Sequence, residues 1–472
     1  MNQKEFKLDL NYSTILELSN ALDTKKVSCT ELLSNVLERI SNLEPTINSF
    51  AFLDEGSALV QAKESERRQM SGKRLSHLDG IPTSVKDLIS VKGMPQRFGS
   101  KSTSNELKKE DAPSVDRLRK AGAIFIGKST TSEFGCKAVG DSPLTGFTRN
   151  PWSVENTAGG SSGGAAAMVS AGIVPYAIGT DGGGSIRIPA SLCGVFGIKA
   201  QFGRVPVFPY SATPTLAHVG PLSRRVKDSA LILETISGFD PRDPYSLKEK
   251  APGFVKATKK QSQFKIAYSH SMGFAKPEKE VSLLVDESVK RLEDYGHSVD
   301  LVENVMKDPQ EIWASEFYAG VGAKLSKVIA DNPHLLDPAI RIILEQNFLK
   351  SVAEYYSKVF ERLEFREKLR TFFTKYDLLV TPTLPVSSVE IGLNVPKEYD
   401  KNALVTWVKY TYPFNLTGQP AASIPIGFSR SGQPVGLQVV ARTRREDSIF
   451  DLCQQLENIM SIYSRQPNIG KY

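Results

Sequence analysis

The segment from residue 158 to residue 199 alternates glycine-rich turns with apolar stretches, and this alternation restricts the fold more than any other feature of the chain. A small-residue helix, GGAAAMVSAG, follows the turn AGGSSGG, and a strand, VPYAIGT, follows the helix. The turn TDGGGS and a second short strand, GIKA, come later in the segment. Strands that alternate with helices in this way are typical of a layered α/β fold, in which helices cover a sheet.

Apolar periodicity extends this pattern along most of the chain. Capping-box spacing from Ser28 to Glu31, followed by apolar residues at helical intervals, predicts a helix over about 29–43. The other expected elements are helices near 57–69, 113–120, 281–293, 309–375 and 446–460, and strands near 81–89, 123–127, 264–270, 297–303, 376–385, 421–428 and 434–441. The charged segment 240–262 is broken by prolines and predicts a surface connection. We therefore expect one domain, residues 1–472, with an excursion from its sheet at about 240–310.

The charge balance gives no reason to expect a nucleic-acid or membrane partner. Lys and Arg total 59 and Asp and Glu total 52, so a net charge of +7 is spread over 472 residues. The N-terminus, MNQKEFKLDLNYS, lacks the apolar core of a signal peptide. The most apolar long run, residues 165–179, is shorter than a membrane span and contains Pro175. We expect a cytoplasmic protein whose four widely spaced cysteines stay reduced.

The sequence contains a possible phosphate-binding motif and five histidines, but neither predicts a nucleotide or metal site. Residues 122–129, GAIFIGKS, match the phosphate-loop pattern, but the four residues between the glycines are apolar and predict a buried strand. No two histidines have metal-ligand spacing, and most are interpreted as surface or packing residues; the five are His77, His218, His270, His297 and His334. We expect neither a cofactor nor a metal.

The turn AGGSSGG is the first candidate for a reactive site. It fits the nucleophile pattern G-x-S-x-G, but the polar run before it is not the strand that a hydrolase elbow requires. Its glycines open an alanine-rich helix, so crowding of the backbone explains them better than flexibility does. The residues alone do not decide whether Ser161 or Ser162 takes part in chemistry.

Two further stretches supply groups that such a site needs. The turn TDGGGSIR, residues 180–187, presents consecutive backbone N–H groups that can stabilise a developing oxyanion. Asp181 and Arg187 flank it, and a tight turn fixed by their salt bridge is the alternative interpretation. Lys86 follows an apolar run on an expected interior strand. A buried Lys86 would be neutral and able to act as a base, whereas a lysine on an edge strand would lie at the surface.

Together these motifs resemble those of the amidase signature family. The matching segments are GIPTSVKD at 80–87, GGSSGG at 159–164, GTDGGGSIRIPA at 179–190, GVFGIK at 194–199, PTLP at 382–385, FNLTGQPAASIPIGF at 414–428 and PVGLQVVA at 434–441. The resemblance extends over about residues 10–460, and the step from Ser161 to Ser185 has the family's spacing. It implies an α/β fold with one large mixed central sheet that is flanked on both faces by helices.

The same resemblance implies a Ser-cisSer-Lys triad. Ser185 is the implied nucleophile, Ser161 the bridging serine after a cis peptide bond, and Lys86 the base. The implied supporting residues are Ser162, which hydrogen-bonds around the lysine, and Asp181 and Arg187. The implied oxyanion hole consists of the backbone N–H groups of Gly182, Gly183, Gly184 and Ser185.

The activity that the resemblance implies is that of a free-standing amidase, which hydrolyses a small carboxamide to an acid and ammonia or an amine through an acyl-enzyme. The alternative is the glutaminase subunit of a tRNA-dependent amidotransferase, but WASEFYAGVGAKL, residues 313–325, does not match the segment that such subunits carry. A non-catalytic binding relative is less favoured, because all three triad residues are present. The expected partner is the amide substrate, and the sequence leaves a homodimer open.

The substrate pocket is expected to lie among variable helices around 130–150, 310–350 and 400–415. Gly182 stands where the family often has a larger residue, so we expect an altered pocket shape. Five residues are candidates to line the pocket, although a place in the ordinary core is the better interpretation of each one alone: Phe134, Cys136, Phe208, Trp313 and Trp407.

Overall fold

A computed structural model describes residues 8–348, 351–400, 403–460, 463 and 465–469. The described residues form an 11-stranded sheet with the order β1-β3-β2-β8-β10-β9-β14-β15-β13-β11-β12. Its strands are β1 (Phe50–Leu53), β2 (Pro82–Lys86), β3 (Ile124–Ser129), β8 (Tyr176–Asp181), β9 (Phe196–Lys199), β10 (His218–Ser223), β11 (Lys265–Tyr268), β12 (Ser298–Leu301), β13 (Leu378–Pro382), β14 (Ala421–Phe428) and β15 (Pro434–Ala441). Two separate pairs consist of β4 (Asp141–Ser142) with β5 (Gly146–Phe147), and β6 (Arg149–Asn150) with β7 (Ser153–Thr157).

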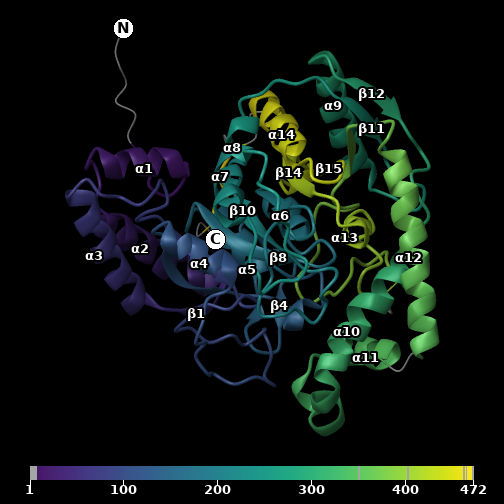
Figure 1. The fold of residues 1–472 in the computed structure, drawn as a ribbon, viewed down its shortest axis with the longest axis horizontal. Coiled ribbons are helices and arrows are strands. Elements are labelled where there is room, and N and C mark those ends of the chain that lie inside the picture. The colour runs from purple at the N-terminus through teal and green to yellow at the C-terminus, as the bar shows by residue number, and fades with distance from the viewer. Residues whose placement is uncertain (1–7, 349–350, 401–402, 461–462, 464, 470–472) are drawn as a thin grey trace.

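Helices pack on both faces of the large sheet. They are α1 (Ile15–Asp23), α2 (Cys29–Ile47), α3 (Glu55–Met70), α4 (Pro113–Lys120), α5 (Gly163–Ser170), α6 (Arg187–Cys193), α7 (Val226–Ile236), α8 (Phe254–Ala257), α9 (Lys279–Asp294), α10 (Gln310–Asp331), α11 (Pro338–Phe348), α12 (Val352–Phe372), α13 (Pro413–Thr417) and α14 (Glu446–Met460). Figure 1 shows β1 on the side of α2 and α3, and β11 and β12 beside α9 at the far end of the sheet. Side chains alternate between the faces of a strand. In β8, Tyr176 and Ile178 pack in a core with α7 and α14, whereas Ala177 packs with α5. The predicted fold class is therefore confirmed.

The sheet is mixed, and its parallel part places the site. Strand β2 runs parallel to β3 on one side and to β8 on the other, with Ser84 opposite Ala177 and Val85 opposite Ile178. The carboxyl ends of parallel neighbours meet at the same edge of a sheet. Lys86, the last residue of β2, therefore lies beside the end of β8, where Thr180 and Asp181 stand.

Several expected elements differ in the structure. The stretch 309–375 is divided into α10, α11 and α12 instead of being continuous. Pro333 lies between the first two helices, where proline cannot continue a helix, and Pro338 begins α11, a position that tolerates proline. Residues 130–150, expected to be helical, contain the 3₁₀ turn η1 (Glu133–Gly135) and short strands, because glycine and proline interrupt the segment. A second 3₁₀ turn, η2, spans Pro333–Leu335. In the expected helical segment 400–415, residues 401–402 lie outside the described residues, and α13 begins only at Pro413.

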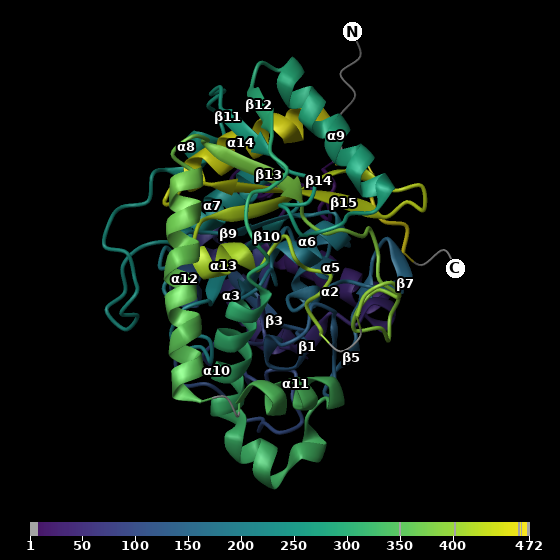
Figure 2. The same cartoon turned by 90° about the vertical axis from the view of Figure 1, so that its right-hand side faces the viewer.

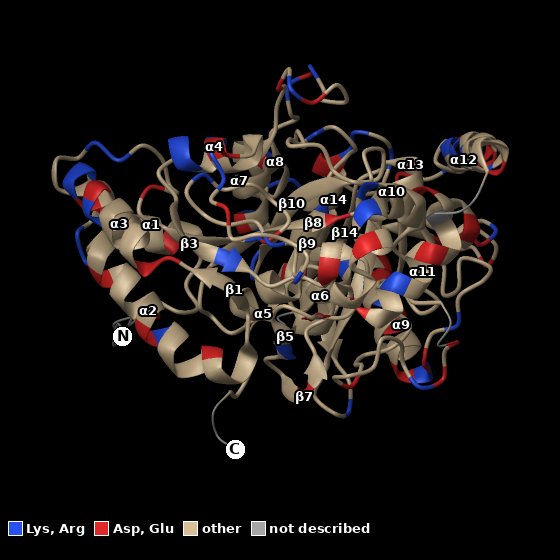
Figure 3. Cartoon of the chain, turned by 90° about the horizontal axis from the view of Figure 1, so that it is seen from below, with Lys and Arg blue, Asp and Glu red and all other residues tan. Residues whose placement is uncertain are grey.

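The outer surface carries both signs of charge. Lys and Arg alternate with Asp and Glu on α3, α11 and the loops around α9 (Figure 3). Helix α12 runs along the outside of the molecule next to α10 (Figure 2). Among the described residues, no helix is long and apolar enough to cross a membrane. Residues 1–7 of the N-terminus lie outside the described residues.

Candidate active site

Lys86 points its amine into the interior of the protein. Its Nζ atom lies 2.7 Å from Ser161 Oγ, 2.9 Å from Ser162 Oγ and 2.9 Å from Thr180 Oγ1. The side chain is fully buried, because β2 lies between β3 and β8. The surface position that the sequence left open for this lysine is therefore wrong.

The turn before α5 holds two serines against this amine. The peptide bond between Gly160 and Ser161 is cis, and the N–H of Ser162 donates to the carbonyl of Ser185 at 3.1 Å. A side chain at Gly160 would collide with the carbonyl oxygen of Val139. The glycine is thus required by a close approach of two backbone segments, as the sequence predicted, and the turn is not a flexible linker.

The loop between β8 and α6 is fixed by a buried ion pair. Arg187 donates from Nε and Nη2 to the two carboxylate oxygens of Asp181, at 3.0 and 2.9 Å, and both side chains are fully buried. The remaining donors of the guanidinium are satisfied by three later residues, with Thr411 O at 2.9 Å, Asn415 Oδ1 at 2.7 Å and Gln438 Oε1 at 2.7 Å. Because the Arg187 guanidinium donates charge-assisted hydrogen bonds to all of these acceptors, it holds the loop in one conformation.

The backbone N–H groups of this loop differ in their partners. Gly184 N–H donates to Asp181 Oδ1 at 2.7 Å, and Ile186 N–H donates to Asp181 Oδ2 at 3.2 Å. Among the described residues, no acceptor contacts the N–H groups of Gly182, Gly183 or Ser185. Of the four N–H groups that the resemblance implies for an oxyanion hole, Gly184 alone is engaged within the loop.

Burial shifts the ionisation of the groups at this site. It lowers the pKa of Lys86 well below that of an exposed lysine, and the Asp181 carboxylate opposes this shift only in part. Burial acts to raise the pKa of Asp181, but the Arg187 guanidinium outweighs it and holds that pKa below its usual range. The site thus combines a lysine that tends to the neutral amine with a carboxylate that stays ionised.

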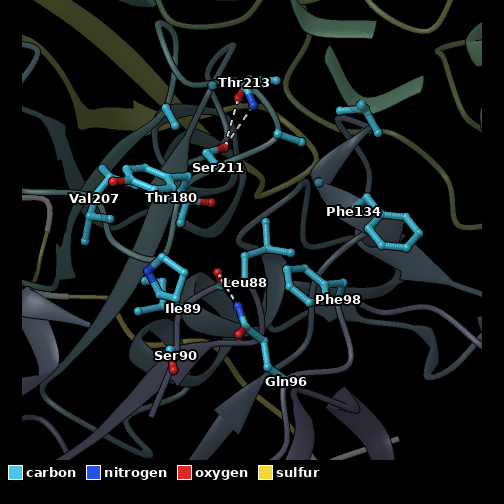
Figure 4. A pocket seen from close by; sticks show the side chains of 18 of the residues that line it. Leu88, Ile89, Ser90, Gln96, Phe98, Phe134, Thr180, Val207, Ser211 and Thr213 are labelled. Carbon is cyan, nitrogen blue, oxygen red and sulfur yellow. Dashed lines mark hydrogen bonds between the residues drawn. The ribbon is translucent and has the colours of Figure 1, made fainter. Parts of the chain in front are cut away.

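A cavity of about 410 Å³ opens beside Ser161 and Ser185. Figure 4 shows Leu88, Phe98 and Phe134 around this space, with Thr180 and Val207 across from them. Its walls are mainly apolar, and α10 contributes Phe317, Val321, Leu325 and Val328. A side chain at Gly182 would come within 2.8 Å of the Phe317 ring, so the glycine leaves room for this wall.

Two of the five predicted lining residues border the cavity. Phe134 and Phe208 are among its walls, whereas Cys136, Trp313 and Trp407 are not. Cys136 and Trp407 are core residues, which is the interpretation that the sequence favoured for each of the five. Trp313 belongs to the same core cluster. Its indole N–H also donates to the carbonyl of Gly182 at 2.8 Å, in the loop between β8 and α6 that is called the 181–185 loop from here on.

Thr180 and His218 are among the polar residues of this site that sequence reasoning missed. Thr180 contacts the Lys86 amine, and its position directly before Asp181 in the glycine cluster could have indicated it. His218, which begins β10, lines the cavity, and its Nδ1 lies 2.7 Å from Leu216 O and 3.2 Å from Asp181 O. Burial lowers its pKa well below the usual value, which favours the neutral imidazole. Histidine spacing gave no signal for it.

Comparison with known proteins identifies the family. A family model described as amidase matches residues 31–450. The chain is 32% identical over 468 residues to an acylamidase of Rhodococcus erythropolis, across 97% of this chain and 98% of that protein. It is also 32% identical over 492 residues to one subunit of the glutamyl-tRNA(Gln) amidotransferase of Moorella thermoacetica, across 98% and 100% of the two chains. The chain belongs to the amidase family, and the prediction of an amidase-family enzyme is confirmed.

A solved structure supports the same assignment at the level of the fold. A bacterial aryl acylamidase of the amidase signature enzymes superposes with a TM-score of 0.88 and 26% sequence identity. The match covers 95% of this chain and 96% of that chain. The resemblance on which the sequence interpretation depended therefore extends to the fold of nearly the whole chain.

Proposed function

We propose that the chain is a free-standing amidase that hydrolyses the C–N bond of a carboxamide through an acyl-enzyme on Ser185. The observation that carries this proposal is the buried Lys86 amine, 2.7 Å from Ser161 Oγ, next to a cavity that Ser161 and Ser185 both border. A desolvated amine beside a hydroxyl is the arrangement that activates a nucleophile at neutral pH.

The proposed chemistry transfers protons through Ser161. The neutral Lys86 amine accepts the proton of Ser161, which takes the proton of Ser185, and Ser185 Oγ forms a bond to the carbonyl carbon. The electron pair of the C=O bond moves to the oxygen, which backbone N–H groups of the 181–185 loop that have no acceptor within the loop stabilise. The C–N bond then breaks, and the leaving nitrogen takes the proton back through the same relay. Water, activated by the same residues, releases the acid from Ser185.

The wall of the cavity supports an apolar substrate group. Aromatic and aliphatic side chains form most of the lining, and the volume of about 410 Å³ accommodates more than acetamide. The relatives include an acylamidase and an aryl acylamidase, and an acyl anilide is therefore a suitable first probe. We also propose, from the sequence, that the enzyme is cytoplasmic and that its 1–472 chain is one domain; a homodimer stays open.

The positive charges that border the cavity predict that substrates with a cationic acyl chain are hydrolysed less well than neutral ones. Lys108 and Lys324 border it, and the lining carboxylate, Asp181, is paired with Arg187. Among the described residues that line the cavity, no other carboxylate is present to pair with an ammonium on the acyl chain, which would therefore meet only like charge. We expect 6-aminohexanoyl 4-nitroanilide to be hydrolysed with a kcat/KM about tenfold or more below that of heptanoyl 4-nitroanilide, which has the same length. Equal values, or a preference for the cationic chain, would contradict this assignment, and Lys324→Gln should narrow the difference.

Independence from a second protein chain separates the proposal from the glutaminase alternative. The acylamidase and the amidotransferase chain are equally similar in sequence, so identity does not distinguish them. We expect the purified chain alone to release 4-nitroaniline from heptanoyl 4-nitroanilide, or ammonia from a simple amide. Product formation would be followed by absorbance with the Ser185→Ala variant as the blank. Turnover that appears only after a partner protein and tRNA are added would favour the alternative.

A further inference from the structure

Each peptide group between Asp181 and Ser185 is held by its carbonyl oxygen. The four donors, in chain order from Asp181 O to Gly184 O, are Asn415 Nδ2 (3.0 Å), Trp313 Nε1 (2.8 Å), Thr411 Oγ1 (2.7 Å) and Ile188 N (2.7 Å). In a trans peptide the C=O and N–H bonds of one plane point in opposite directions. A donor that fixes the carbonyl of one residue therefore also fixes the direction of the next residue's N–H.

The peptide groups differ in how much freedom this leaves them. The group between Gly183 and Gly184 is held at both ends, because its carbonyl accepts from Thr411 and its N–H donates to Asp181 Oδ1. The group between Gly182 and Gly183 is held at the carbonyl by Trp313, and no acceptor among the described residues takes the N–H of Gly183. The Gly183 N–H therefore has a fixed direction but no acceptor among the described residues.

We propose that Trp313 is a positioning residue, which aims the Gly183 N–H at the oxyanion, and that the Gly184 N–H stays on Asp181 and is not an oxyanion donor. This inference rests on the proposed function, because it assigns parts to the same reaction. Electrostatic stabilisation of an oxyanion depends on donors that are oriented before the reaction begins. Trp313 supplies that orientation from helix α10, far from the loop in the sequence.

The packing around Trp313 leaves its indole little freedom to move. The side chain is 3% exposed and stacks on Phe317, with ring centroids 4.6 Å apart and planes 22° apart. Tyr412 stacks on it as well, at 5.7 Å. A Cβ atom at Gly183 would lie 2.6 Å from Trp313 Cζ2, so the loop backbone rests directly on the ring. The ring and the peptide plane therefore hold each other in place.

A core tryptophan that merely satisfies its N–H is the competing explanation, and Trp407 provides the comparison. Trp407 belongs to the same apolar cluster and is fully buried, but its indole N–H has no acceptor among the described residues. Replacing either tryptophan by phenylalanine removes similar packing. Only the change at position 313 also removes a hydrogen bond to the loop.

The test compares Trp313→Phe with Trp407→Phe in the full chain, using heptanoyl 4-nitroanilide and a fluorophosphonate probe that phosphonylates Ser185. We expect Trp313→Phe to lower kcat by about ten- to a hundredfold with little change in KM, since small misplacements of catalytic groups cost about this much. The rate of phosphonylation should fall by a similar factor, because the phosphonyl oxygen occupies the same donors. Trp407→Phe should keep both rates near those of the wild type at a comparable loss of thermal stability.

Equal kcat in the two variants would overturn the inference and leave the proposed function standing. A wild-type chain without turnover that depends on Ser185 would overturn the proposed function itself. Should Trp313→Phe fail to fold, β-(3-benzothienyl)alanine at position 313 preserves the ring shape and replaces the N–H by sulfur. The same loss of kcat is expected for that variant, and full activity in it would contradict a positioning role.

Discussion

The Lys86→Ala variant is expected to lose about four orders of magnitude or more in kcat/KM, because removal of one member of a nucleophile–base unit disables the whole unit. Lys86 lies within 2.7–2.9 Å of three hydroxyl oxygens, and its side chain is fully buried. Steady-state kinetics with heptanoyl 4-nitroanilide, supported by circular dichroism of the variant, measures this loss.

The pH dependence follows from the direction of the pKa shift. An ammonium has no lone pair and cannot accept the proton of Ser161, so the neutral amine is the active form. Burial lowers the pKa of Lys86 below that of an exposed lysine, which brings the neutral form within reach at ordinary pH. The value of kcat/KM should therefore rise as pH increases through that lowered pKa and then level off. Below the pKa, activity should fall about tenfold for each pH unit.

Two further variants test whether Lys86 acts as a base or only supplies a buried positive charge. Lys86→Arg should be no more active than the alanine variant, because a guanidinium stays protonated. Lys128 is a matched control, since it is a buried lysine on the neighbouring strand β3, with a pKa lowered by burial to about 8 and with its amine 2.6 Å from Ile89 O. Lys128→Met should lose stability but keep its activity per folded molecule. Near-normal turnover of Lys86→Arg at neutral pH would show that the lysine only positions charge.

The sequence predicted the elements whose boundaries carry strong local signals. Strands β14 and β15 and helices α4 and α14 coincide with the expected segments, since glycine, proline or a change of periodicity marks their ends. Strand β10 was missed because Gly220 and Pro221 lie inside it, and both residues argue against a central strand. The structure pairs Pro221 with Ile178 of β8, so tertiary packing overrides the local preference.

The site was predictable only where its residues lie in contiguous motifs. Ser161, Asp181 and Ser185 stand in two short turns whose glycines and spacing are visible in the sequence. Trp313 and Thr411 reach the same loop from segments more than a hundred residues away, through single hydrogen bonds to backbone carbonyls. No spacing rule links a donor to a carbonyl at such a separation, and an indole or a hydroxyl alone is more often an ordinary core group.

Ser185→Ala should reduce turnover to the rate of the uncatalysed reaction without protein, a loss of about 10⁴ to 10⁶ in kcat, because no acyl-enzyme can form without the nucleophile oxygen. Ser161→Ala should approach the same loss. The Ser161 hydroxyl lies 2.7 Å from the Lys86 amine, and without it no group passes the proton of Ser185 to that amine. Ser162 accepts from the lysine and from Thr180 N–H, and it also donates to Thr180 O, so Ser162→Ala should be milder than either. A Ser162→Ala variant that is as inactive as Ser185→Ala would contradict its supporting role.

The location of the covalent adduct tests the account most directly. All three serines lie on one tryptic fragment, residues 150–187, so tandem mass spectrometry after reaction with a fluorophosphonate can assign the added mass to one of them. The prediction is a single adduct on Ser185, formed in the wild type and absent from both Ser185→Ala and Lys86→Ala over the same time. An adduct on Ser161 or Ser162 in the wild type would contradict the assignment of nucleophile and relay.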